Sequence, residues 1–156
     1  YLAPRDYHRF HAPCAGSVTR VAHVPGSLWP VNAIGLQGVD RLFARNERIC
    51  AYLNLAGTVG PRADLCLVAV GATLVGKIRL RFDDLSSHRR GAEPSERVYP
   101  DPGIGLERGA EWGHFEFGST LVMAARPGAF ELDVREPGTP VRMGEAIGRF
   151  FPAVSR

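Results

Sequence analysis

A mainly β domain with a few short helices and one long loop is the fold that this sequence predicts. Short runs of aliphatic and aromatic residues, bounded by Gly, Pro and Asn, recur along the chain, whereas helical periodicity is nearly absent. The 156 residues, with 45% hydrophobic and 22% charged side chains, suffice for one hydrophobic core. We therefore expect residues 1–156 to form a single domain.

Seven segments have the alternation or the short apolar run of a strand. They span residues 16–24, 48–55, 63–70, 72–80, 113–117, 119–125 and 129–134. Residues 39–46 form the one candidate helix, and the polar, Pro- and Gly-rich residues 83–113 predict the long loop. The longest apolar run, residues 65–76, is broken by glycine and is shorter than the ~20 residues of a membrane-spanning helix.

Two segments, residues 16–32 and 128–150, share an order of glycine, alternating strand, Pro-Gly turn and return. The second contains V-x-x-G-E-A-I-G (residues 141–148), which resembles the closing segment of barrel-sandwich hybrid folds such as lipoyl domains. We therefore expect a domain like a barrel-sandwich hybrid, although turn chemistry alone would also produce this similarity.

Charge and cysteine content exclude some classes of function. The net charge of +3 is spread along the chain, which argues against nucleic acid but leaves an anionic membrane surface or a small acidic substrate open. Three scattered cysteines suit a reducing compartment better than a disulfide framework. His8, His11 and Cys14 are competent zinc ligands, but no second Cys/His cluster completes a structural site, so we expect no metal.

The stretch "HFEFGSTLVM" (residues 114–123) alternates like one strand, yet Gly118 and Ser119 interrupt it. A bulge glycine followed by an ordinary strand serine is one interpretation. The other is that the Ser119 hydroxyl attacks the carbonyl carbon of Gly118, where the lack of a side chain eases the approach. The sequence pattern alone favours the first interpretation.

His8 and His11 lie in "DYHRFHAP", between Pro4 and Pro13, which discourage a long helix. A strand would place positions three apart on opposite faces, whereas a loop can present both imidazoles to one cleft. The loop gives the two histidines a joint role as proton carriers. A polar surface loop without function is the alternative.

Four motifs occur in this chain in a fixed order: "YLAPRDYHRFHAP", "LFARNER", "VGATLVGKI" and "FGST", which span residues 1–13, 42–48, 70–78 and 117–120. Together they resemble phosphatidylserine decarboxylases, a family of pyruvoyl-dependent enzymes that cleave their own precursor. Phe117 replaces the leucine of the family's L-G-S-T motif.

The resemblance implies self-cleavage between Gly118 and Ser119 into a β chain, residues 1–118, and an α chain, residues 119–156. Ser119 would become a pyruvoyl group, which forms a Schiff base with the amine of phosphatidylserine, so that loss of CO₂ yields phosphatidylethanolamine. No metal or dissociable cofactor is required.

The resemblance also implies roles for particular side chains. His11 corresponds to the base of self-cleavage and His8 to a neighbour that handles substrate or transfers a proton in decarboxylation, although these two roles are exchangeable. Tyr7 and Thr120 are further candidates for substrate binding. The lipid substrate implies a peripheral position on the cytoplasmic face of a bacterial membrane, with the tip formed by Leu28 and Trp29 either at the interface or in the core.

The family's processing triad includes an aspartate that precedes the segment matched here, and Asp6 occupies another position. We therefore expect this chain to be the C-terminal part of a longer enzyme. An inactive fragment of the decarboxylase, a non-catalytic hybrid-barrel binding or carrier module, and a pyruvoyl enzyme for a soluble amino acid are the alternatives. Dimerisation stays open.

Overall fold

Strands make up most of the regular structure. The computed structural model describes residues 1–3, 5–55, 64–73, 75, 77–88, 91–118, 120–133 and 136–151. The elements in these ranges are β1 (Arg9–His11), β2 (Gly16–Val24), α1 (Ala33–Gly38), α2 (Leu42–Arg45), β3 (Arg48–Leu55), β4 (Leu65–Val70), β5 (Ile78–Leu80), β6 (Ser95–Val98), β7 (Ile104–Leu106), β8 (Glu111–Phe115), β9 (Thr120–Ala125), β10 (Phe130–Leu132) and β11 (Gly148–Phe150).

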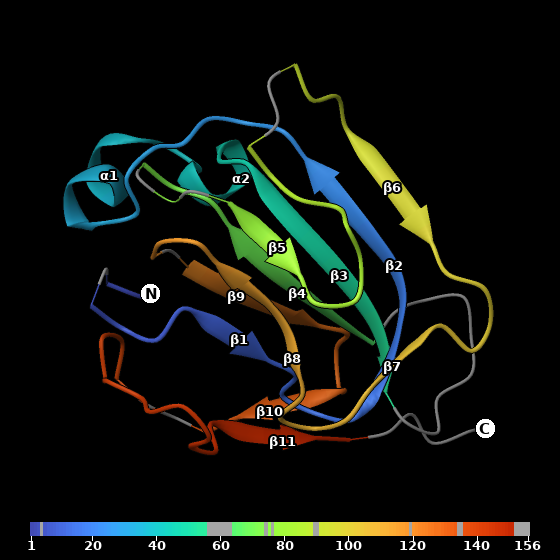
Figure 1. Cartoon of the computed structure of the whole chain (residues 1–156). Helices are drawn as coiled ribbons and strands as arrows, with labels where there is room; N and C mark the ends of the chain where they lie inside the picture. Colours follow the sequence, from blue (N-terminus) through green and yellow to red (C-terminus); the bar gives the residue numbers. More distant parts are fainter. Residues whose placement is uncertain are drawn as a thin grey trace.

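All paired strands are antiparallel and form three sheets (Figure 1). The largest sheet has the order β6-β2-β3-β4-β9, with β7 also paired to β2. The second sheet has the order β1-β8-β5, and the third is the β10-β11 hairpin. None of these sheets closes into a barrel within the described residues.

An irregularity in β2 lets two short strands share one of its edges. The register of β2 against β3 shifts between Val18 and Arg20, as in a β-bulge. Before the shift β2 pairs with β7, and after it with β6. The predicted long loop, residues 83–113, therefore contains β6, β7 and the start of β8, and only parts of this polar segment are a loop.

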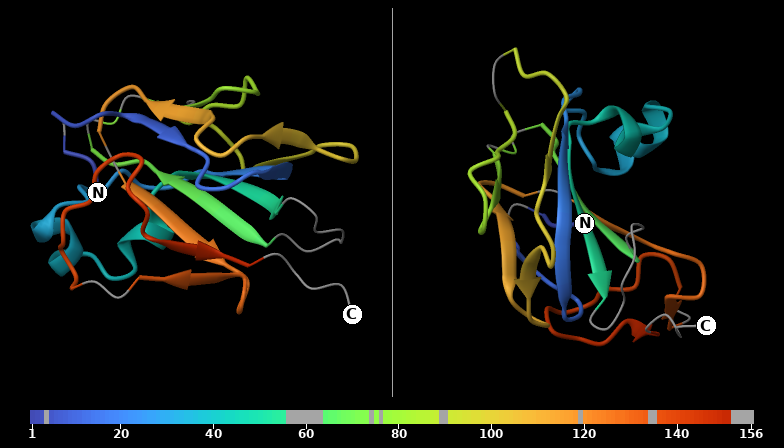
Figure 2. Two further views of the ribbon diagram at one scale, coloured as in Figure 1. Left: turned by 90° about the horizontal axis from the view of Figure 1, so that it is seen from below. Right: turned by 90° about the vertical axis from the view of Figure 1, so that its right-hand side faces the viewer.

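The hydrophobic core lies between the two larger sheets, which Figure 2 shows as two layers. Ile49 and Leu53 of β3 point into it from the large sheet, and both are fully buried. Phe10 of β1 meets them from the small sheet and packs on Trp112 with ring centroids 4.3 Å apart. A methyl group at Gly113 would collide with the Phe10 ring, which explains a glycine inside β8.

The mainly β prediction is confirmed, and β2 and β3 have the predicted bounds. The predicted helix over residues 39–46 contains α2, whereas α1 was missed. That helix carries a capping signal, because the Asn32 side chain accepts a hydrogen bond of 3.0 Å from the Gly35 backbone NH. Short strands such as β1 and β11 were missed because three residues are too few for an alternation to register.

Candidate functional site

Gly118 lies where the chain passes from one sheet to the other. β8 of the small sheet ends at Phe115, and β9 of the large sheet begins at Thr120. The single interrupted strand suggested by the alternation is therefore two strands in different layers. Ser119, the predicted nucleophile, lies outside the described residues.

The imidazole of His8 lies against Gly118. His8 directly precedes β1, where its carbonyl accepts a hydrogen bond of 3.0 Å from the Phe115 NH. Its ring stacks on Phe117 with centroids 6.0 Å apart. A methyl group added at Gly118 would lie 3.0 Å from His8 Nε2 and 2.9 Å from the carbonyl oxygen of Leu2. His8 and the Leu2 backbone can therefore lie this close to residue 118 only because it has no side chain.

The hydrogen bonds of His8 indicate which ring nitrogen carries its proton. Nε2 lies 3.2 Å from the carbonyl oxygen of Ala3. Because a carbonyl oxygen only accepts, Nε2 donates in this contact. Neutral His8 therefore directs an N–H group toward the side of the ring where Gly118 lies.

His11 has different partners. Its Nδ1 donates to the carbonyl oxygen of Gly109 at 2.7 Å, so in the neutral ring Nε2 keeps the lone pair. That lone pair accepts the hydroxyl of Tyr7 at 2.9 Å, and the two rings stack with centroids 5.7 Å apart. The half-exposed Tyr7 therefore covers the basic nitrogen of His11.

The expectation that a loop carries both histidines is wrong. His11 ends strand β1, and the two imidazoles contact separate groups, Gly118 with Phe117 for His8 and Gly109 with Tyr7 for His11. Pairing with β8 decides this outcome, and the local sequence between the two prolines does not contain that information.

Thr120, next to Ser119 in sequence, carries a buried hydroxyl without a partner. The residue is 6% exposed and pairs with Val70 of β4. Its Oγ1 makes no hydrogen bond in the described part of the chain. An unsatisfied buried hydroxyl costs about 1–3 kcal/mol of stability. Such a group calls for an explanation, and a role in function is one.

The role of the chain's first residues was not predicted from the sequence. The backbone of Leu2 and Ala3 borders Gly118 and His8. Asp6 holds this segment, since its Oδ2 accepts the Ala3 NH at 2.7 Å while its own NH binds the Ala3 carbonyl. Asp6 is thus a local structural residue, and within the described part of the chain it forms no hydrogen bond or ion pair with either histidine.

His23 stood alone in the sequence but is paired in the structure. Its Nε2 lies 2.7 Å from Oε1 of Glu47, and both side chains are buried. The same carboxylate oxygen accepts the His88 backbone NH at 2.9 Å. This pair joins β2 to the start of β3, and only the strand register reveals it.

No three His, Cys, Asp or Glu side chains within the described ranges are grouped so that they could hold a metal ion. His11, one member of the candidate zinc set, uses both ring nitrogens for Gly109 and Tyr7. The described residues contain no helix besides α1 and α2, and neither is long or apolar enough to cross a membrane.

Comparison with known proteins identifies the family. The described residues form an antiparallel two-layer β domain with a histidine against Gly118. The phosphatidylserine decarboxylase family matches residues 1–149. The chain belongs to this family. It is 44% identical over 151 residues to a phosphatidylserine decarboxylase proenzyme of Anaeromyxobacter sp. (strain K), covering 95% of this chain and 51% of that protein.

Two further relatives carry the same name, phosphatidylserine decarboxylase proenzyme. The protein of Variovorax paradoxus (strain S110) is 45% identical over 149 residues, which are 94% of this chain and 50% of the relative. The protein of Brevibacillus brevis is 38% identical over 149 residues, again 94% of this chain and 51% of the relative. The chain thus spans about half the length of the curated relatives it matches.

Proposed function

We propose that this chain is the catalytic part of a phosphatidylserine decarboxylase that first cleaves itself between Gly118 and Ser119. The observation that carries the proposal is the packing of His8 Nε2 against Gly118, at a position where a methyl group would not fit. Family membership supports it, and so does the name of the relatives, proenzyme, which denotes a precursor that is processed.

In the proposed cleavage this chain supplies the nucleophile, Ser119, and the base, His11, whereas the aspartate of the family's triad precedes the matched segment. Ser119 Oγ attacks the carbonyl carbon of Gly118 and loses its proton to His11, and the peptide C–N bond is replaced by an ester. Elimination of the ester releases the Gly118 carboxylate and leaves a dehydroalanine at position 119. Hydrolysis of that residue gives ammonia and a pyruvoyl group at the start of residues 119–156.

If His11 is the base, the Tyr7 hydroxyl that now occupies its basic nitrogen must give way. Neutral His11 has its lone pair on Nε2, and the Tyr7 hydroxyl already donates to that atom at 2.9 Å. For His11 to accept the serine proton, Tyr7 must either move away or pass the proton on through its own hydroxyl. Tyr7 is 52% exposed, so its side chain has room to move.

The residues beside Gly118 suit a pyruvoyl group. When present, this group supplies an electron sink for decarboxylation of a substrate that carries a primary amine. His8 offers an N–H donor for proton transfer there, and the hydroxyl of Thr120, which has no partner among the described residues, offers a further hydrogen bond. The phospholipid substrate keeps the enzyme peripheral to a membrane, and we place it on the cytoplasmic face of a bacterial membrane.

The intact mass of the purified chain, measured beside the Ser119→Ala variant, tests the proposal. We expect two fragments that meet at 118/119 in the parent, with the smaller one lacking the ammonia of its former serine. Ser119→Ala should stay uncut while keeping its fold, because the change removes one hydroxyl. Normal cleavage of that variant would refute the assignment, and an uncut parent chain would favour a non-catalytic module or an inactive fragment.

A matched pair of histidine variants separates the two proton-transfer roles. We expect His11→Ala to slow cleavage severely, whereas His8→Ala should be cut and then be defective in releasing CO₂ from phosphatidylserine. Because His8 is the imidazole that contacts Gly118, the competing result is loss of cleavage in His8→Ala alone. That result would exchange the two roles.

A further inference from the structure

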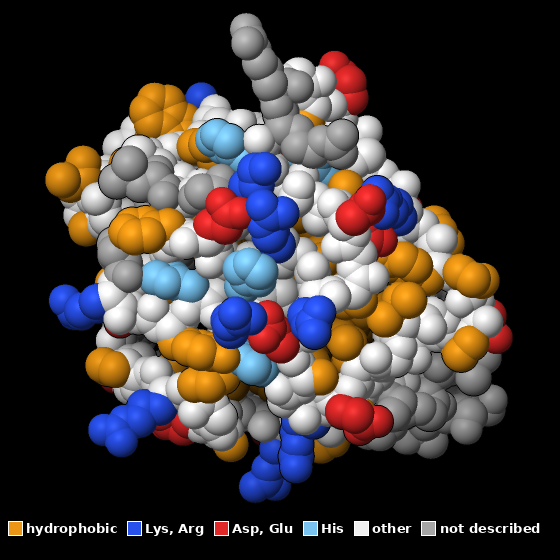
Figure 3. Space-filling view, in the orientation of Figure 1, with side chains coloured by type: hydrophobic (Ala, Val, Ile, Leu, Met, Phe, Trp, Pro, Cys, Tyr) orange, Lys and Arg blue, Asp and Glu red, His pale blue; other side chains and the backbone are white. Residues whose placement is uncertain are grey.

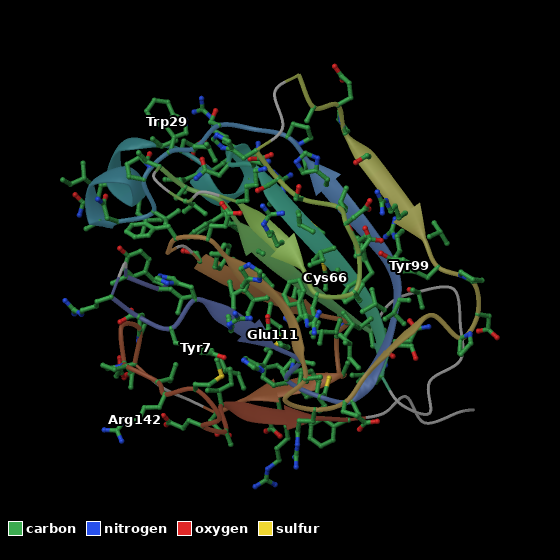
Figure 4. All side chains as sticks on the ribbon, viewed as in Figure 1. Tyr7, Trp29, Cys66, Tyr99, Glu111 and Arg142 are labelled. Atoms are coloured by element: carbon green, nitrogen blue, oxygen red, sulfur yellow. The ribbon has the colours of Figure 1, made fainter. Side chains whose placement is uncertain are left out.

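One end of the molecule carries a cluster of exposed apolar side chains next to α1 and α2. Ile34 is 79% exposed, Leu36 50%, Trp29 43% and Phe43 38%. All four side chains lie within residues 29–43. In Figure 3 apolar side chains gather over this part of the molecule, and Figure 4 shows Trp29 at its outer side. Four large apolar groups exposed together usually mark an interaction surface.

The packing of α1 explains why these side chains point outward. Gly35 is the buried residue of this helix, and a methyl group there would overlap the carbonyl oxygen of Pro30. The helix therefore rests on the preceding segment through bare backbone. Its two large apolar residues, Ile34 and Leu36, flank Gly35 and are left in solvent.

Two cationic side chains belong to the same surface. Arg41 and Arg45 are both exposed, and no carboxylate lies within ion-pair distance of either in the described residues. A groove of about 370 Å³ runs between the helices and is lined by Leu36, Val39, Arg41, Leu42, Phe43 and Ala44. We call Trp29, Ile34, Leu36, Phe43, Arg41 and Arg45 the α1–α2 surface.

The strand registers place this surface at the same end of the large sheet as Gly118. The chain runs from α2 into β3 at Arg48, which pairs with Val70, and Val70 pairs with Thr120 at the start of β9. Leu28, which precedes Trp29, also lies close to Gly71 just after β4, because a methyl group added at Gly71 would be 3.2 Å from Cδ2 of Leu28. In Figures 1 and 2 the helices, the N-terminal segment and the β8–β9 connection share one end.

We propose that the α1–α2 surface docks on an anionic phospholipid bilayer and holds the Gly118 site at the lipid headgroups. The inference rests on the proposed function, because a substrate with two acyl chains stays in the bilayer. Aliphatic and tryptophan side chains beside cations are the chemistry of the membrane interface. Arg41 and Arg45, which have no carboxylate partner in the described residues, complement the negative charge of an anionic bilayer.

Co-sedimentation with vesicles tests the docking without relying on enzymatic activity. The chain should bind vesicles of phosphatidylcholine mixed with phosphatidylglycerol, and Leu36→Ser should weaken that binding about tenfold, as expected for withdrawing one leucine from an apolar environment. Leu132→Ser is the matched control, since Leu132 is 59% exposed on β10, away from this surface. Equal binding by the two variants would overturn the proposal.

The charge contribution is tested with Arg41→Gln and Arg45→Gln. Each change should weaken binding to anionic vesicles about fivefold while leaving the weaker binding to pure phosphatidylcholine unchanged. Arg149→Gln in β11, an exposed arginine elsewhere, should have no such effect. If each variant lost as much binding to pure phosphatidylcholine vesicles as to anionic ones, the arginines would not act through the charge of the lipid.

Two more results separate this proposal from its competitors. If Leu36→Ser changed the oligomeric state of the chain but not its vesicle binding, the surface would be an interface between copies. The intact mass of each variant reports self-cleavage independently. Failed docking in a normally cut chain would overturn the surface alone, whereas normal docking of an uncut chain would overturn the proposed function alone.

Discussion

The two histidines of this chain differ at the level of single atoms. His8 uses Nε2 as a donor beside Gly118, whereas His11 is a donor at Nδ1 and an acceptor at Nε2. Two neutral imidazoles in opposite tautomers supply both a proton donor and a proton acceptor. This division agrees with the separate roles that we propose for them.

Gly118→Ala tests the steric argument at the cleavage position. The backbone torsion φ of Gly118 is not positive, so the backbone conformation suits alanine, and the strain of the substitution falls on the contacts of the new methyl group. The new methyl group must displace His8 or Leu2, and we expect cleavage, followed by gel or mass analysis, to slow about tenfold or more. Gly105→Ala, whose methyl group would meet no atom within 4 Å, should be cut at the parent rate.

Cys50 and Cys66 form a thiol pair on neighbouring strands, which yields a prediction about pH. The hydrogen bond from Cys66 lowers the pKa of Cys50 to about 7, helped by Arg48 and Arg20, and the pKa of Cys66 is raised in turn. A lowered pKa populates the thiolate at lower pH, so alkylation by iodoacetamide should rise near pH 7 at Cys50.

Cys14 is the internal reference for that experiment. Burial, with a smaller contribution from the charge of Asp64, raises its pKa to about 11, so it should stay unlabelled until the solution is strongly alkaline. Peptide mapping after alkylation at a series of pH values identifies the labelled residue. Equal labelling of Cys14 and Cys50 at neutral pH would contradict the assignment.

At the scale of elements, Asn46 fixes the loop before α1 to the end of β4. Its Oδ1 accepts the Trp29 NH at 3.0 Å, and its Nδ2 donates to the carbonyl oxygens of Trp29 at 2.8 Å and Gly71 at 2.9 Å. The side chain is fully buried. The loop that carries Trp29 and the strand that pairs with Thr120 thus depend on one amide group.

Asn46→Ala should lower the free energy of unfolding by about 3 kcal/mol, because it leaves buried backbone groups of Trp29 and Gly71 without partners. Asn32→Ala is the matched control. It removes only the exposed cap of α1 and should cost about 1 kcal/mol. Urea denaturation followed by tryptophan fluorescence measures both values, and similar losses would show that Asn46 does not organise this region.

At the scale of the whole molecule, the proposed cleavage falls between two layers that share one core. Residues 119–156 would keep β9 in the large sheet, where it pairs with β4 from Thr120 to Ala125. Just after β9, Arg126 Nε lies 3.0 Å from Oδ1 of the buried Asp64, and its NH binds the Asp64 carbonyl. These contacts join the two products without the peptide bond.

The two fragments should therefore co-elute in size-exclusion chromatography and separate only in denaturant. Arg126→Ala should lower the stability of this association by about 1–2 kcal/mol, since the ion pair is half exposed at Arg126 and buried at Asp64. Arg149→Ala should leave the association unchanged. Fragments that separate spontaneously in buffer would show that the β4–β9 ladder is too weak to hold them.

Most of what could be predicted rests on patterns among residues that are close together in the sequence. β2 and β3 are long, alternate regularly and are bounded by Gly or Asn, so their bounds emerged from the sequence. α1, β1, β7 and β11 were not predicted, because they are shorter than the window over which a period is recognisable. The site motifs likewise singled out Gly118, His8 and His11.

Sequence by itself determined the mainly β class, the family and the residues of the candidate site, since alternation and motifs are properties of neighbours along the chain. Only the tertiary structure decided that Phe115 and Thr120 belong to different sheets, that His8 rather than His11 contacts Gly118, and that His23 has Glu47 as its partner. These facts depend on strand pairing, which brings together residues far apart in sequence and sets the face of each side chain.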